Sequence, residues 1–141
     1  MLKRMVQVQV QYTGELGCQA VHGPSQATLN TDAPVDNQGR GLSFSPTDLT
    51  ATSLGACMLT IMGIKARDHD WAIEGSIATV VKHMVSSPVR RISKLEVVID
   101  VVGKGHDERA RKVLHAAAMA CPVKQSLHPD IEIVVDMRFA D

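Results

Sequence analysis

The strongest helix-forming segment of this 141-residue chain lies in its first half and has a sharply defined start. Ser45 is a good N-cap, Pro46 suits the first helical position, and Asp48 can bond back to the cap and meet the helix dipole. Apolar and small residues then continue to Ile64, which predicts a helix that is apolar on most of its circumference. Such a helix must be buried in a core or against a close partner.

Strand patterns precede this helix. From Met5 to Tyr12, valines and glutamines alternate with period two, which predicts a half-buried antiparallel strand. Two shorter strands are expected at 18–22 and 27–31, separated by a Gly-Pro turn. Residues 32–44 show no periodicity, so we expect a loop there, and loops of this length often carry function.

Strand and helix patterns also alternate after the helix. Residues 71–85 and 90–102 are expected to form a long hairpin, with a register break at Ser93-Lys94. The remaining elements are a helix over 107–120, a short helix over 122–127 and a final strand over 131–139. Together they predict an α+β fold in which antiparallel sheets pack on a long central helix and a second helix. We expect residues 1–141 to form a single domain.

Charge and composition exclude several classes of function. Fifteen basic and fifteen acidic residues cancel, and no Lys/Arg run exceeds Arg90-Arg91, so we expect neither nucleic acid nor membrane as a partner. The N-terminus alternates apolar and polar residues, unlike a signal peptide, and polar residues interrupt every long apolar stretch. These patterns predict a cytoplasmic protein. Three cysteines cannot form a closed disulfide framework there, which leaves catalysis, metal binding or burial in the core.

Cys57 and Cys121 are the candidate reactive residues. Cys57 lies in the apolar helix, where a free cysteine is as often a core residue as a nucleophile. Cys121 precedes Pro122 at or near the N-cap of the short helix, where the positive end of the helix dipole predicts a lowered thiol pKa. No metal and no cofactor is expected, because Cys and His pairs with chelating spacing are absent from the sequence, as are nucleotide-binding motifs.

Three motifs can be compared with known families: the helix start Ser45-Pro46-Thr47-Asp48-Leu49, the run Leu54-Gly55-Ala56-Cys57, and Cys121-Pro122-Val123. With their cysteines 64 residues apart, they resemble the OsmC/Ohr family of osmotically induced and organic hydroperoxide resistance proteins, over nearly the whole chain. The resemblance implies an intertwined homodimer with two symmetric sites at its interface. It also implies that Cys57 attacks an organic hydroperoxide and becomes a sulfenic acid, and that Cys121 condenses with it to a disulfide. A dithiol restores both thiols, and dihydrolipoyl groups serve as that reductant in the best-understood branch.

The chain differs from the peroxidatic branches of that family beside the nucleophile. Those branches have a glutamate where this chain has Thr47, and an arginine in the turn that corresponds to residues 13–16, which contain none. Arg40, Asp48 and His22 are the residues that could replace this electrostatic support.

A second function is compatible with the same residues. In this alternative the chain is a non-peroxidatic OsmC-like dimer that binds a small apolar molecule, and Cys57 and Cys121 are buried core residues. The reactivity of the thiols in the native protein distinguishes the two functions. Cys18 is expected to be a structural residue of a strand or of the core.

Overall fold

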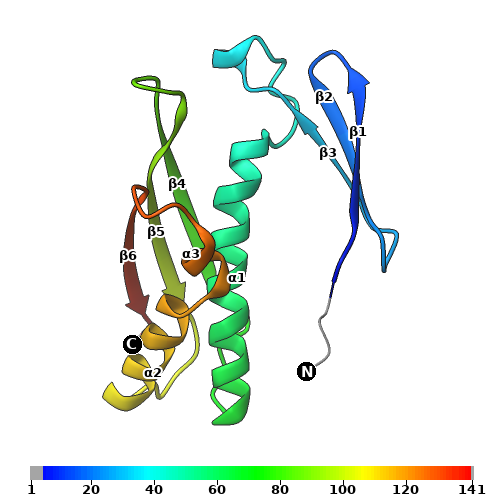
Figure 1. Ribbon diagram of the computed structural model, residues 1–141. Helices are drawn as coiled ribbons and strands as arrows, with labels where there is room; N and C mark the ends of the chain where they lie inside the picture. Colours follow the sequence, from blue (N-terminus) through cyan, green and yellow to red (C-terminus); the bar gives the residue numbers. More distant parts are fainter. Residues whose placement is uncertain (1–4, 141) are drawn as a thin grey trace. The chain divides into compact units, whose positions relative to one another are not determined.

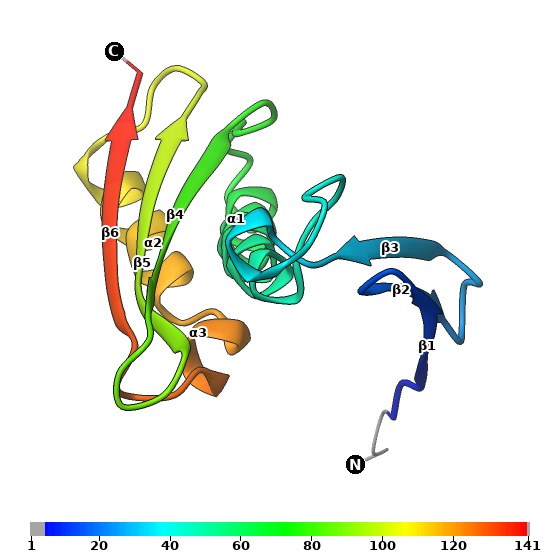
Figure 2. The same ribbon diagram turned by 90° about the horizontal axis from the view of Figure 1, so that it is seen from above.

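The computed structural model describes residues 5–140. Its internal contacts divide the chain into two compact units, Met1–Leu49 and Thr50–Asp141. Each unit contains one three-stranded sheet, and the long helix begins at the end of the first unit (Figure 1 and Figure 2). The α+β class expected from the sequence is confirmed. That the chain is a single domain stays a prediction.

The first unit is an antiparallel sheet of β1 (Val8–Gly14), β2 (Gly17–His22) and β3 (Thr28–Asp32). Val10 pairs with Ala20, and Ala20 pairs with Leu29, so these apolar residues share one face of the sheet. Val10 is 62 % exposed and Leu29 is 45 % exposed in the single chain. The half-burial predicted for the first strand is therefore wrong for the single chain, which leaves an apolar face uncovered.

The loop expected at 32–44 has a defined structure that includes a short 3-10 helix, η1 (Val35–Asn37). The N–H of Gly39 donates to the carbonyl oxygen of Pro34 at 2.9 Å, which folds the loop back on itself. A Cβ atom on Gly39 would collide with the backbone of Ala33, so glycine is required at this close approach. The loop therefore has a defined conformation, and it ends where the long helix starts.

The long helix, α1 (Pro46–Asp68), begins at the predicted cap. The N–H of Ser45 donates to Oδ2 of Asp48 at 2.8 Å, and the N–H of Asp48 donates to Oγ of Ser45 at 3.1 Å. This reciprocal pair is a capping box with aspartate in place of glutamate. The buried residues of α1 form a single stripe, so burial on most of the circumference is not seen in the single chain: Ala51, Leu54, Gly55, Met58, Met62 and Ala66.

The apolar character of α1 also makes it the one helix among residues 5–140 that is long and apolar enough to cross a membrane. Its most apolar segment has a mean hydropathy of 1.4, and 33 % of that segment is buried inside the chain. The core helix of a globular protein meets the same criterion, and the stripe from Leu54 to Ala66 belongs to such a core.

The second unit has a sheet in the order β4, β5, β6, formed by β4 (Ile77–Val85), β5 (Arg91–Val101) and β6 (Glu132–Phe139). β4 and β5 are antiparallel, and the predicted register break is confirmed, since His83 pairs with Lys94 while Met84 pairs with Ile92. The bulge at Ser93 keeps Ile92 on the buried face of β5.

Two features of this unit differ from the sequence predictions. β5 and β6 are parallel, not antiparallel. The connection between them contains α2 (Glu108–Met119) and α3 (Pro122–Ser126), and it returns the chain to the end of the sheet where β5 begins. The strand predicted from Trp71 begins only at Ile77, because Gly75 has a φ of +92° and a turn precedes the strand.

The core of the second unit lies on one face of β5. Every second residue of that strand from Leu95 onward is buried, so the helices that cover it share that face. The buried residues that contact each other include Leu54, Met58 and Met62 of α1, Leu95, Val97, Ile99 and Val101 of β5, and Leu114, Ala117 and Ala118 of α2. Cys121 belongs to the same cluster.

Candidate active site

Cys57 and Cys121 meet in the second unit. Cys57 lies in α1, and Cys121 is the N-cap of α3, directly after α2. Their side chains lie close to each other in the packed core, although 64 residues separate them in the sequence. Cys57 is partly exposed and Cys121 is fully buried. The two cysteines chosen from the sequence are therefore neighbours, while their chemical roles stay predictions.

The pKa of the Cys121 thiol is raised, which contradicts the prediction from its helix position. Burial is the largest cause, and the neighbouring Cys57 adds to it, because a buried thiolate beside another sulfur loses hydration and meets a like charge. The N–H of Lys124 donates to the sulfur at 3.3 Å and opposes this rise. The prediction is wrong because α3 has only five residues, so the field of its N-terminus is too weak to offset burial in the core.

The raised pKa keeps a proton on Cys121, so this residue is a thiol at neutral pH. A protonated sulfur beside Cys57 can donate its hydrogen to a thiolate there. A negative charge on Cys57 in turn opposes ionisation of Cys121. The geometry therefore suits different roles for the two cysteines. Cys57 is accessible as a nucleophile, and Cys121 is a buried thiol that can react in a second step.

This raised pKa predicts that stability falls in alkaline solution. Between the ordinary pKa and the raised one, the unfolded chain releases the Cys121 proton while the folded chain keeps it, so the free energy of unfolding decreases as pH rises. Urea unfolding of the reduced protein between about pH 8 and pH 10 should show a steeper loss for the wild type than for Cys121→Ser. Cys18→Ser should follow the wild type, and equal slopes for wild type and Cys121→Ser would contradict the prediction.

Two of the three supporting residues have local structural partners. Asp48 is part of the capping box of α1, and His22 is bonded within its own turn, with Nδ1 at 2.6 Å from Oγ of Ser25. Both belong to the first unit. Their predicted role beside the nucleophile has no support from these contacts.

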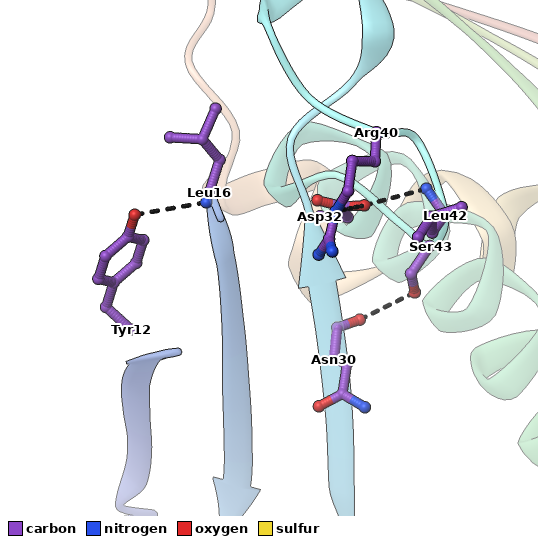
Figure 3. Close-up of polar contacts among 7 residues, drawn as sticks. All are labelled: Tyr12, Leu16, Asn30, Asp32, Arg40, Leu42 and Ser43. Atoms are coloured by element: carbon purple, nitrogen blue, oxygen red, sulfur yellow. Dashed lines mark hydrogen bonds and ion pairs between the residues drawn. The ribbon is translucent and has the colours of Figure 1, made fainter. Parts of the chain in front are cut away.

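Arg40 is held by a residue that the sequence patterns did not single out. Nε of Arg40 lies 3.5 Å from Oδ2 of Asp32, whose side chain is only 4 % exposed (Figure 3). Asp32 is the last residue of β3, whereas the sequence pattern places it at the start of a polar loop. The sequence feature that could have identified Asp32 is its position, eight residues before Arg40, the only arginine of that loop.

Among residues 5–140, no group of three His, Cys, Asp or Glu side chains is placed to hold a metal ion.

A family model described as OsmC-like protein matches residues 39–136. A crystal structure from Psychrobacter arcticus 273-4, provisionally described as an osmotic stress induced and detoxification response protein, is 45 % identical to this chain. The similarity covers 97 % of this chain and 98 % of that one, with a TM-score of 0.89. This chain belongs to the OsmC-like family. The matched residues of this OsmC-like protein include Cys57, Cys121, Arg40 and Asp48, whereas His22 and Asp32 precede them.

More distant structures share the OsmC-like fold. An organic hydroperoxide resistance protein OsmC from Legionella pneumophila is 16 % identical, with a TM-score of 0.73 over 98 % of this chain and 99 % of that one. A provisionally named organic hydroperoxide resistance protein from Vibrio cholerae, with captopril bound in one of its active sites, is 18 % identical, with a TM-score of 0.75 over 97 % and 93 %. Curated proteins gave no match. At these identities the similarity shows the fold of the OsmC-like protein alone.

Proposed function

We propose that this OsmC-like protein is a thiol-dependent peroxidase that reduces organic hydroperoxides. The observation that supports the proposal is the proximity of Cys57 and Cys121, one side chain partly exposed and the other fully buried. A sulfenic acid is captured efficiently when a thiol already lies beside it. The apolar residues packed around Cys57 suit an organic peroxide better than a charged substrate.

The proposed reaction has two steps on the protein. The thiolate of Cys57 attacks the distal oxygen of the peroxide, an S–O bond forms, the O–O bond breaks, and the alkoxide takes a proton and leaves as an alcohol. The thiol of Cys121 then attacks the sulfenic sulfur, a disulfide forms, and the hydroxyl group leaves with the thiol proton as water. The two cysteines lose two electrons and the peroxide gains them.

A dithiol completes the cycle. One of its sulfurs attacks the protein disulfide to give a mixed disulfide, and the second sulfur displaces the protein thiol and becomes part of a cyclic disulfide. A lipoyl-type dithiol fits this step, because its two thiols lie on one carbon chain. A reducing compartment such as the cytoplasm suits three free cysteines, and we place the protein there.

Arg40 is the proposed electrostatic support. Its guanidinium is half exposed and its loop is held in a defined shape. A fixed cation favours the thiolate before attack and the alkoxide that leaves. This assignment replaces the arginine that the peroxidatic branches have in the turn after the first strand.

The proposed assembly is a homodimer. The face of the first sheet that carries Val8, Val10, Tyr12 and Leu29 is exposed in the single chain, and so is Ile64 of α1. Surfaces this apolar are normally covered by a partner, and a second copy of the chain carries the same surfaces.

A single-turnover experiment tests the function. Reduced protein is mixed with one equivalent of cumene hydroperoxide, and non-reducing peptide mass analysis should find a Cys57–Cys121 disulfide. Without an added dithiol, Cys121→Ser should stop at the sulfenic acid of Cys57, which dimedone traps. If neither thiol reacts with peroxide or alkylating reagent in the native protein, the proposal fails, and the ligand-binding dimer with core cysteines takes its place.

A further inference from the structure

The short helix α3 of the second unit depends on few contacts. All five of its residues are described, and none of them is buried. A helix of this length is not stable on its own, because fixing its first turn costs more than so few backbone hydrogen bonds can offset. Val123 and Leu127 pack only partly against the core. The contacts at the ends of α3 therefore decide whether the helix is formed.

The N-terminal end of α3 is held by the sulfur of Cys121. The N–H of Lys124 belongs to the first turn, whose N–H groups have no partner inside a helix, and it donates to Sγ of Cys121 at 3.3 Å. A side-chain acceptor at the N-cap stabilises a helix, and Ser, Thr, Asp and Asn are the usual residues there. In α3 the N-cap is a cysteine that lies close to Cys57. One sulfur is therefore both the cap of a helix and the neighbour of a second thiol.

Two other side-chain contacts of α3 do not involve a sulfur. Nε2 of Gln125 donates to the carbonyl oxygen of Met119 in α2 at 3.2 Å. Oγ of Ser126 donates to the carbonyl oxygen of Pro122 at 2.8 Å. Neither contact contains an atom that is oxidised, so the bond from Lys124 to Cys121 is the one of these three that depends on the redox state.

A disulfide and the cap make competing demands on the Cys121 side chain. A disulfide brings two sulfurs to about 2.0 Å at a restricted dihedral angle, so Sγ of Cys121 has to turn toward Cys57 in α1. The same atom caps α3 by lying at its first turn. A sulfur in a disulfide also cannot become a thiolate, which makes it a weaker acceptor for an N–H than a cysteine sulfur.

We propose that α3 is a redox-sensitive switch, an inference that rests on the proposed function. In the reduced protein, Cys121 caps α3 and the helix is formed. When the two thiols lose two electrons and two protons and their sulfurs bond, the cap is lost and residues 122–127 open. Val123 and Leu127 then leave the cluster that contains Cys121, which opens the disulfide to the dithiol. Reduction restores the cap and closes the segment.

Hydrogen exchange of the backbone amides, followed by NMR, tests the switch. The reduced wild type is compared with protein oxidised by diamide, a diazene that takes two electrons and two protons from a pair of thiols and becomes a hydrazine. Amides of residues 123–127 should exchange about fivefold faster in the oxidised protein, which is the effect of losing a typical N-cap. The amide of Val97 in the buried part of β5 should show no acceleration, so it reports on global unfolding.

Two variants separate the cap from the disulfide. Cys121→Ser and Cys121→Ala cannot form the disulfide, but serine is a good helix cap and alanine has no acceptor. Without oxidant, Cys121→Ala should exchange in α3 as fast as the oxidised wild type, and Cys121→Ser as slowly as the reduced one. Gln125→Ala is the matched control, because it removes a contact with α2 that contains no sulfur. It should accelerate exchange in both redox states and leave their ratio unchanged.

A second readout uses the lysine of α3. Opening of the segment exposes the Lys124–Gln125 bond, and cleavage follows the population of the open form. A lysine-specific protease should therefore cut there about fivefold faster in the oxidised protein. Lys104, an exposed residue between β5 and α2, is the internal reference and should be cut equally in both states.

Equal exchange rates in the reduced and the diamide-oxidised wild type would overturn the inference. Slow exchange in Cys121→Ala would do the same, since α3 would then not depend on the sulfur. Both results leave the proposed function intact if cumene hydroperoxide still joins the two cysteines. If diamide joins them and peroxide does not, the peroxidase function has failed while the exchange rates still decide the switch. If neither reagent joins them, both have failed.

Discussion

Replacing Cys57 by serine is expected to abolish peroxide reduction, with the rate constant for cumene hydroperoxide falling at least about a hundredfold. The reason is that a serine hydroxyl does not ionise near neutral pH, whereas a thiol supplies an accessible thiolate for attack on the O–O bond. Stopped-flow mixing with excess peroxide, followed by titration of the remaining peroxide, measures the loss. The fold should be retained, because Cys57 is partly exposed and serine is smaller than cysteine.

Cys18→Ser is the control for this experiment, since it removes one thiol from β2 and leaves the pair in the second unit intact. It should react like the wild type. A Cys57→Ser protein that still consumes peroxide at the wild-type rate would show that the reaction does not use this sulfur.

Placing a charge on the apolar face of the first sheet is expected to dissociate the proposed dimer. Val10 is 62 % exposed in the single chain, and in a symmetric dimer two copies of Val10→Asp would each bury an unpaired carboxylate. At about 2 kcal/mol for each copy, the dissociation constant should rise about a thousandfold. Sedimentation velocity across a range of concentrations measures the change.

Gln9→Asp is the matched control, because Gln9 is the neighbour of Val10 in β1 and points to the opposite face of the sheet. It should leave the assembly unchanged. A Val10→Asp protein that sediments like the wild type would place the interface elsewhere, and a wild type that is monomeric at all concentrations would remove the homodimer.

Local chemistry made parts of the fold predictable from sequence. The start of α1 is defined by three residues whose side chains and backbone bond to each other, so Ser45, Pro46 and Asp48 were sufficient. The bulge at Ser93 was visible as a break in the alternation of β5. The parallel pairing of β5 and β6 was not predictable in this way, because alternation gives the faces of a strand but not the direction of its neighbour.

Some residues of the candidate site could likewise be predicted from the sequence, and other features of the site could not. Cys57 and Cys121 were identified by residue type and motif, and they lie close together in the second unit, while their chemical roles stay predictions. The direction of the Cys121 pKa was wrong because burial depends on residues distant in sequence, which outweigh the local helix terminus. Asp32 was missed for the same reason, since its burial and its contacts with Leu42 and Arg40 arise only when the loop closes.

The order of elements between the two cysteines has a mechanical consequence. Cys57 precedes β4 and Cys121 follows α2, so both strands of the antiparallel pair lie between them along the chain. A bond between the two sulfurs, which are 64 residues apart, would enclose this whole segment in a covalent ring. A chain pulled from its ends would then extend about 200 Å less when oxidised than when reduced, at about 3.3 Å per residue. The redox state of the two sulfur atoms would therefore determine the maximum length to which the polypeptide can be extended.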